Sequence, residues 1–180
     1  RRALEIREKV LGPEHPDTLA SVNYLGLSLV NLGKYDAAEA MLRRALEIRE
    51  KLLGFEHPET LESVSNLGSV LSRLGKFDEA ETMHRRELEA REKVLGPEHP
   101  DTLNSVNNCA VALFDLGKYD EAEAMHQRAL HMREKMLGPE HPDTVNSIID
   151  LGLTYYGLGK YNKAESMLRR AANPGGCARF

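Results

Sequence analysis

The chain has 180 residues, 41% of them hydrophobic and 29% charged, a composition that excludes both a membrane-spanning protein and a disordered polyampholyte. Its 24 basic and 28 acidic residues give a net charge of −4, which argues against nucleic acid or a membrane surface as a partner. Two cysteines, Cys109 and Cys177, are too few for a disulfide framework and are typical of a reducing compartment. We therefore expect a cytoplasmic protein. Because the first residue is Arg1 rather than methionine, we also expect the chain to be part of a longer one.

A repeat of 42 residues dominates the sequence. The motif Gly-Pro-Glu-His-Pro-Asp-Thr begins at Gly12, Gly96 and Gly138, and a variant of it begins at Gly54. Residues 1–11 match residues 43–53 at ten of eleven positions and so form the end of a preceding repeat. The predicted organisation is the second helix of a truncated repeat (1–11), four repeats (12–53, 54–95, 96–137 and 138–172) and a disordered tail (173–180).

Each repeat predicts two helices and no strand. Apolar positions recur at spacings of three and four residues over 16–32 and again over 35–52, with a Gly-Lys-Tyr turn between them. His15-Pro16-Asp17 is a typical helix start, because proline suits the first turn and an acid there faces the helix dipole favourably. Gly54 is expected to end the second helix in the left-handed helical conformation.

The repeats resemble a known family. The matching residues of the first repeat are Val22, Leu25, Gly26, Leu29, Gly33, Tyr35, Ala38, Leu42 and Ala45, a pattern similar to the tetratricopeptide repeat (TPR). The longer period and the phrase RALEIREKVLGPEHPDT resemble the repeats of kinesin light chains, and also arrays at the C-termini of fungal NTPase-type receptors. The resemblance implies an all-α, right-handed superhelical solenoid of antiparallel helix–turn–helix repeats, acting as a protein–protein interaction scaffold.

Residue types that could carry chemistry are present but poorly arranged for it. Four of the seven histidines, His15, His57, His99 and His141, occupy one repeat position, and stacked helices separated by about 8–10 Å keep them too far apart to share a metal. We expect them to cap helices. The Gly-Lys pairs lack the spacing of a phosphate-binding loop, and Cys109 stands at a core position. We therefore predict no catalytic residue, metal or cofactor, and no enzyme.

The resemblance also implies where a ligand binds, because the first helices of TPR arrays line a concave groove. Only four of the 24 positions on these helix faces are charged. Asparagine offers both a donor and an acceptor to a peptide backbone, and we expect Asn66 and Asn108 to hold ligand backbone. The candidate groove residues are Asn23, Tyr24, Leu27, Asn66, Ser69, Arg73, Asn104, Asn107, Asn108, Val111, Phe114, Asn146, Asp150 and Tyr156.

Two functions remain open at this point. The first is a scaffold that binds peptide segments of partner proteins in the groove; the alternative is a ligand-sensing or oligomerising arm of a larger signalling NTPase. The tryptophan-plus-acidic ligands of kinesin light chains need basic groove residues, and among the groove positions only Arg73 is basic, which disfavours that ligand class. We also expect a homodimer through the terminal repeats, in which the last helix exposes an apolar face around Met167 and Leu168.

Overall fold

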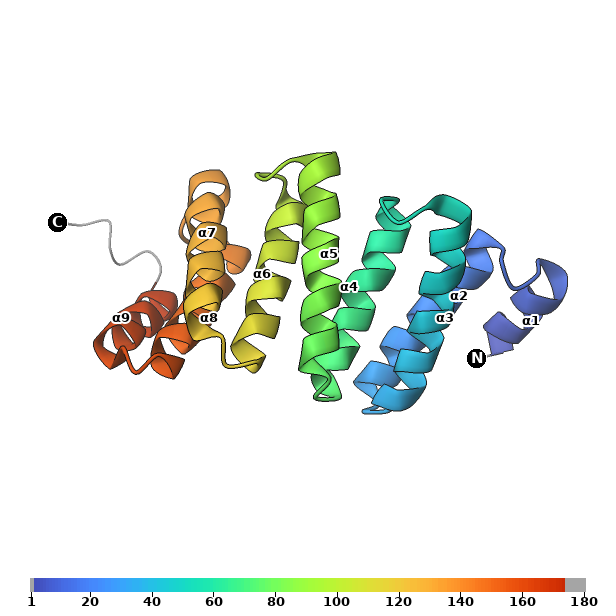
Figure 1. Ribbon diagram of the computed structural model, residues 1–180, viewed down its shortest axis with the longest axis horizontal. Coiled ribbons are helices and arrows are strands. Elements are labelled where there is room, and N and C mark those ends of the chain that lie inside the picture. The colour runs from blue at the N-terminus through green and yellow to red at the C-terminus, as the bar shows by residue number, and fades with distance from the viewer. Residues whose placement is uncertain (1, 174–180) are drawn as a thin grey trace. The chain divides into compact units, whose positions relative to one another are not determined.

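The computed structural model describes residues 2–173, and this part of the chain consists of helices joined by short loops (Figure 1). The helices of that range are α1 (Arg2–Val10), α2 (Pro16–Asn31), α3 (Tyr35–Leu53), α4 (Pro58–Arg73), α5 (Phe77–Leu95), α6 (Pro100–Asp115), α7 (Tyr119–Leu137), α8 (Pro142–Gly157) and α9 (Tyr161–Ala172). No strand occurs among the residues described. The predicted helices are confirmed to within one residue at each end. The predicted tail lies outside the described residues beyond Asn173, as does Cys177.

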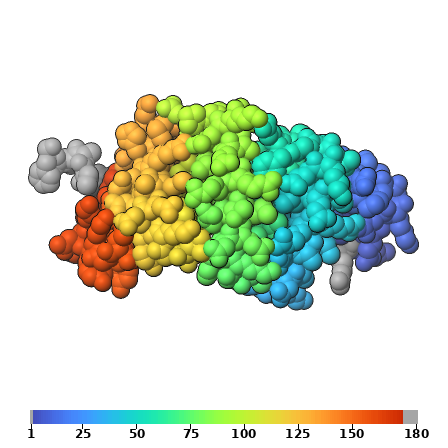
Figure 2. All heavy atoms as spheres, viewed as in Figure 1, coloured from blue at the N-terminus to red at the C-terminus, as the bar shows by residue number. Residues whose placement is uncertain are grey.

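The chain divides into two compact units, Arg1–Ala90 and Arg91–Phe180, and the division falls within α5. In the first unit, α2 packs against α3 and α3 against α4. In the second unit, α6 packs against α7, α7 against α8 and α8 against α9. Side chains fill the space between neighbouring helices inside each unit (Figure 2). None of the helices in residues 2–173 combines the length and hydrophobicity needed to cross a membrane.

The four motif histidines cap the N-termini of the first helices. In each case the Nδ1 atom of the histidine accepts a hydrogen bond from the backbone N–H two residues later, at 3.1–3.3 Å. A proline follows each histidine at the first helical position. The cap satisfies one of the N–H groups that a helix leaves unpaired at its start, so the predicted capping role of these histidines is confirmed.

Glycines end both helices of a repeat, by two different geometries. Gly33 has φ +70°, and the N–H of Lys34 donates to the carbonyl of Leu29 at 2.9 Å, the pattern of a Schellman motif. Gly54 also has positive φ, but its ψ of 164° is extended. The prediction of a left-handed helical cap at Gly54 is therefore wrong in ψ: after the single hydrogen bond to Glu50, the chain leaves the helix directly as an extended segment.

Small residues let the two helices of a repeat approach closely. A Cβ atom placed on Gly26 would come within 2.9 Å of Leu42, and one placed on Gly68 would come within 2.6 Å of the His84 ring. Both partners are buried on the second helix of the same repeat. Both crossings lie in the first unit. Cys109 occupies a fully buried position, as expected for a small apolar residue.

Candidate interaction surface

An arginine near the end of each second helix reaches the first turn of the next first helix. Its Nη1 atom donates to a backbone carbonyl ten residues later, and the Nη1 atoms of Arg7, Arg49 and Arg133 also donate to a serine Oγ fourteen residues later at 2.6–2.7 Å. We call these residues, Arg7, Arg49, Arg91 and Arg133, the clamp arginines. Sequence reasoning missed them, although an arginine followed by a serine fourteen residues later recurs at the same spacing four times in the chain.

Burial of the clamp arginines differs along the chain. Arg7 is exposed, whereas Arg49 is 2% exposed and Arg133 is 6% exposed. The Nη2 atom of Arg133 makes a further bond to Asn104 Oδ1 at 2.7 Å. Burial lowers the pKa of the Arg133 guanidinium, while the nearby carboxylates of Asp143 and Asp150 oppose that shift. The buried clamps therefore fix the distance between consecutive repeats inside each unit.

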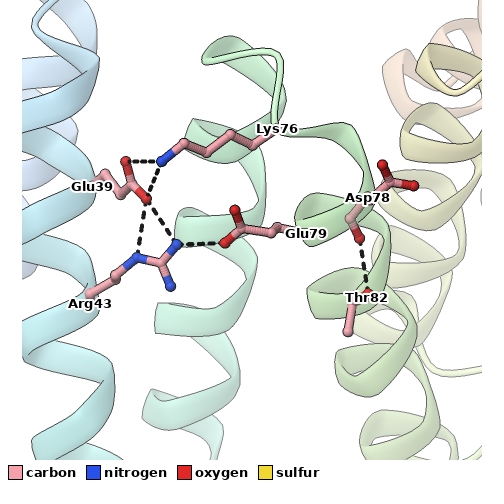
Figure 3. A network of polar contacts seen from close by, with 6 residues as sticks. All are labelled: Glu39, Arg43, Lys76, Asp78, Glu79 and Thr82. Atoms are coloured by element: carbon pink, nitrogen blue, oxygen red, sulfur yellow. Dashed lines mark hydrogen bonds and ion pairs between the residues drawn. The ribbon is translucent and has the colours of Figure 1, made fainter.

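Charged side chains on the second helices, and in the turns just before them, pair with one another. In the first unit, Glu39 lies between Lys76, at 2.8 Å from Nζ, and Arg43, at 2.8 Å from Nη2, and Arg43 also bonds Glu79 at 2.7 Å (Figure 3). In the second unit, the Lys160 ammonium lies 2.6 Å from a carboxylate oxygen on α7. The hydrogen bond from Lys76 holds the pKa of the Glu39 carboxyl below its usual value, against a desolvation effect that raises it.

The predicted groove residues of the first unit lie on α2 and α4, and they differ in exposure. Tyr24 is 67% exposed, Ser69 and Arg73 are exposed, and Leu27 and Asn66 are half-buried. These positions agree with a surface that a ligand could reach.

Asn23 does not lie on that surface as expected. Its side chain is only 3% exposed, and its Oδ1 atom accepts a hydrogen bond from Asn66 Nδ2 at 3.5 Å. The helix position of Asn23 turns it toward α4, where the neighbouring repeat covers it. Asn23 therefore lies at the bottom of a cleft rather than on an open helix face.

The predicted groove residues of the second unit lie on α6 and α8. Asn104, Val111, Asn146 and Tyr156 are exposed, while Asn107, Asn108, Phe114 and Asp150 are half-buried. All eight of these side chains therefore reach solvent.

Contacts inside the second unit already orient several of these side chains. Arg133 occupies the oxygen of Asn104, which leaves the amide nitrogen as the group that Asn104 can offer to a ligand. The ring of Tyr156 lies edge-on to Tyr161, with 5.4 Å between centroids, and Phe114 stands in the same way at 5.2 Å from a tyrosine at the start of α7. These aromatic anchors are held in place before any ligand arrives.

A cleft of about 260 Å³ opens between α2 and α4 in the first unit. We call it the Ala20 cleft; its lining residues are Pro16, Asp17, Ala20, Asn23, Tyr24, Arg49, Glu59 and Glu62. The cavity beside Arg133 in the second unit is only about 40 Å³ and includes Asn104 in its lining. Asn104 stands 84 residues after Ala20, two repeats on, so the second unit has an asparagine bonded to Arg133 where the first unit has alanine.

Two histidines are buried on second helices. His84 Nδ1 lies 3.3 Å from a carboxylate oxygen of Glu87, which is itself fully buried. His126 Nδ1 lies 2.9 Å from the hydroxyl of Thr154. Burial lowers the pKa of the His126 imidazole, and Arg133 lowers it further while Asp150 opposes the shift, so the ring is neutral near pH 7. Across residues 2–173, no group of three or more His, Cys, Asp or Glu side chains is placed to hold a metal.

Comparisons with known proteins agree with this architecture. The family model of the tetratricopeptide repeat matches residues 1–51, 19–93, 59–135 and 106–173. A variant of the nearly identical TPR-like repeats of a kinesin light chain-like protein from Podosopora anserina is similar over 96% of this chain and 82% of that chain, with a TM-score of 0.85 and 28% identity. BtubC (BKLC) from P. vanneervenii is similar over 98% of this chain and 70% of that chain, with a TM-score of 0.83 and 26% identity.

A more distant structure shows the fold alone. The apo form of RapI has a TM-score of 0.80 over 97% of this chain and 62% of that chain, at 16% identity. Among curated proteins, a sequence search finds no match. The similarities confirm the predicted all-α solenoid of helix–turn–helix repeats, and none of them supports the alternative of an arm of a signalling NTPase.

Proposed function

Because the chain belongs to the tetratricopeptide repeat family, whose repeats generally mediate protein–protein interactions, we propose that it is a scaffold that binds extended peptide segments of partner proteins. The binding surfaces are the exposed faces of the first helices, on α2 and α4 in the first unit and on α6 and α8 in the second. Proteins with this fold are typically not enzymes, and the proposal assigns the chain no reaction.

One observation carries the proposal. The second helices pair many of their charges, as Glu39 and Arg43 on α3 do with Lys76 just before α5, whereas the first-helix faces present tyrosines, asparagines and exposed apolar side chains. A solvated face would normally carry lysine and glutamate. Rigid aromatic residues among small polar ones are typical of surfaces that bind other proteins, with Tyr24 and Tyr156 as the exposed anchors.

Asn66 and Asn108 are the proposed contacts to ligand backbone. Each stands on the central part of a first helix, Asn66 in α4 and Asn108 in α6, and each side chain is half-buried. A half-buried amide is partly desolvated, so its hydrogen bonds to a peptide lose less to competing water than those of an exposed side chain.

The test starts from peptides selected on the chain from a phage-displayed random library. We expect Asn66→Ala and Asn108→Ala each to weaken the selected peptides by about 1–3 kcal/mol, which is about five- to 150-fold in Kd. Asn162→Ala is the matched control, because Asn162 is an exposed asparagine on the second helix α9. Peptides whose affinity is unchanged by both groove variants, or is reduced equally by the control, would refute the assignment.

A further inference from the structure

The Ala20 cleft carries an excess of negative charge. Its lining includes three carboxylates, on Asp17, Glu59 and Glu62, and one guanidinium, on Arg49. Glu59 Oε2 lies 3.2 Å from Arg49 Nη2, so these two charges compensate each other. Glu62 is exposed and has no partner within residues 2–173, and Asp17 approaches only the ring of His15, at 3.9 Å. Glu62 therefore remains to attract a cation, and Asp17 adds to it less, because the Arg7 guanidinium lies against the backbone carbonyl of Asp17 at 3.0 Å.

A hydrogen-bond donor opens onto the same cleft. Asn23 is 3% exposed, and its oxygen is occupied by the amide of Asn66. Its Nδ2 group makes no hydrogen bond within residues 2–173 and is not a fully buried unpaired atom, so it faces the solvent of the cleft. A donor in this position can bond water or an acceptor from outside the chain, and the backbone carbonyl of a peptide is such an acceptor.

The remaining lining favours a long side chain over a metal ion. The carboxylates are not grouped closely enough to bind a metal, since no set of three acidic or other ligating side chains converges in the described part of the chain. Tyr24 forms one wall and is 67% exposed, so its ring face is available to a guanidinium or ammonium group. A volume of about 260 Å³ accepts a side chain of that size together with part of its backbone.

We propose that the Ala20 cleft binds an arginine or lysine side chain of an extended peptide. Glu62 and Asp17 pair with its charge, the ring of Tyr24 covers it, and Asn23 Nδ2 donates to a backbone carbonyl of the same peptide. This inference rests on the proposed peptide-binding function and adds the chemistry of the ligand to it. The preference belongs to the first unit, because the second unit has Asn104, bonded to Arg133, at the position of Ala20.

The probe is a short, blocked peptide in which arginine alternates with glycine and serine, and its control is the same peptide with citrulline, a neutral analogue, in place of arginine. Binding is followed by NMR chemical shifts of the whole chain. We expect the arginine peptide to shift the side-chain amide of Asn23 and the backbone amides around Glu62, and the citrulline peptide at the same concentration to leave them in place. Equal shifts with both peptides would overturn the basic preference while leaving peptide binding intact. Chemical-shift changes confined to residues outside the cleft would overturn the site. A single blocked arginine that binds as tightly as the arginine peptide would overturn it as well.

Two variants make the test specific. Ala20→Asn should remove the cleft shifts and keep the fold, because Asn104 and Arg133 already form the same pair in the second unit. Glu62→Gln should weaken the arginine peptide about two- to fivefold, the range of a solvent-exposed ion pair, and Glu140→Gln, at an exposed loop position, should have no effect. An Ala20→Asn variant that binds the arginine peptide as tightly as the parent chain would contradict the proposal.

Discussion

Replacing Arg133 with methionine tests whether the buried clamp arginines hold consecutive repeats together. The substitution keeps most of the apolar stem and removes the guanidinium, which bonds the carbonyl of Asp143 at 3.3 Å, Ser147 Oγ at 2.6 Å and Asn104 Oδ1 at 2.7 Å. These contacts join α7 to the first turn of α8 and to α6.

The magnitude follows from burial. A hydrogen bond from a charged donor contributes about 1.5–3 kcal/mol to the free energy of unfolding. The sum over the three bonds is therefore an upper bound, and the net loss of stability in the variant is smaller. Two effects reduce the loss in Arg133→Met. The buried charge is costly in the folded state, as its lowered pKa indicates, and the freed hydroxyl of Ser147 can donate to the carbonyl of Asp143, as Ser21 does to Asp17 at 3.0 Å. We therefore expect a net destabilisation of about 2 kcal/mol.

The matched control is Arg7→Met. Arg7 makes the same two bonds to the first turn of α2, at 3.0 and 2.6 Å, but its side chain is exposed, so its loss should cost only about 0–1 kcal/mol. Urea unfolding followed by far-UV circular dichroism, with amide hydrogen exchange in α8 as the local readout, measures both variants. Equal losses for Arg133 and Arg7, or faster exchange that spares α8, would refute the reasoning.

Three further predictions follow from the packing. Gly68→Leu should destabilise the chain by about 1–3 kcal/mol or more in thermal unfolding, because even a Cβ would come within 2.6 Å of His84; an unchanged melting temperature would contradict the close crossing. His126→Leu should flatten the pH dependence of the free energy of unfolding. Burial lowers the pKa of His126 in the folded chain, so the neutral ring contributes stability above the unfolded pKa of about 6.5, and this contribution is lost as the pH falls through the folded pKa. An identical slope of unfolding free energy against pH in the parent chain and the variant, from pH 7 to 5, would show that the ring is not buried in its neutral form. Leu168 is 39% exposed and lies beside the apolar cluster of α8 and α9, so we expect it to contribute to a homodimer. Sedimentation should show concentration-dependent association of the parent chain, and Leu168→Lys should abolish it. A parent chain that stays monomeric at high micromolar concentration would refute the dimer.

Helix boundaries could be predicted from the sequence because each repeat marks them with strong local signals. Histidine and proline start the first helix, glycine with positive φ ends it, and the same residues return every 42 positions. Such signals act within one or two turns of the chain. The error at Gly54 arose where two positive-φ conformations are both open to glycine and the residues around it do not choose between them.

Features that depend on contacts between repeats could not be predicted in the same way. The periodicity of α2 assigned Asn23 to its open face, because a helical pattern does not show how far the neighbouring α4 extends over that face. One difference at the Ala20 cleft is alanine in place of the asparagine at position 104, and its consequence appears only when Arg133 is seen to reach that asparagine. The clamp arginines were visible as a repeated residue, but charge alone suggested a solvated side chain rather than a buried one.

The central claim, that partners bind the first-helix faces, is tested most directly by hydroxyl-radical footprinting of the chain with and without a selected peptide. Tyr24 on α2 and Tyr156 on α8 are 67% and 65% exposed, and Leu52 near the end of α3 is 52% exposed, so all three should be oxidised in the free chain. We predict that bound peptide protects Tyr24, Tyr156 or both and leaves Leu52 as reactive as before. Protection of Leu52 with both tyrosines unchanged would place the partner on the second helices and contradict the account.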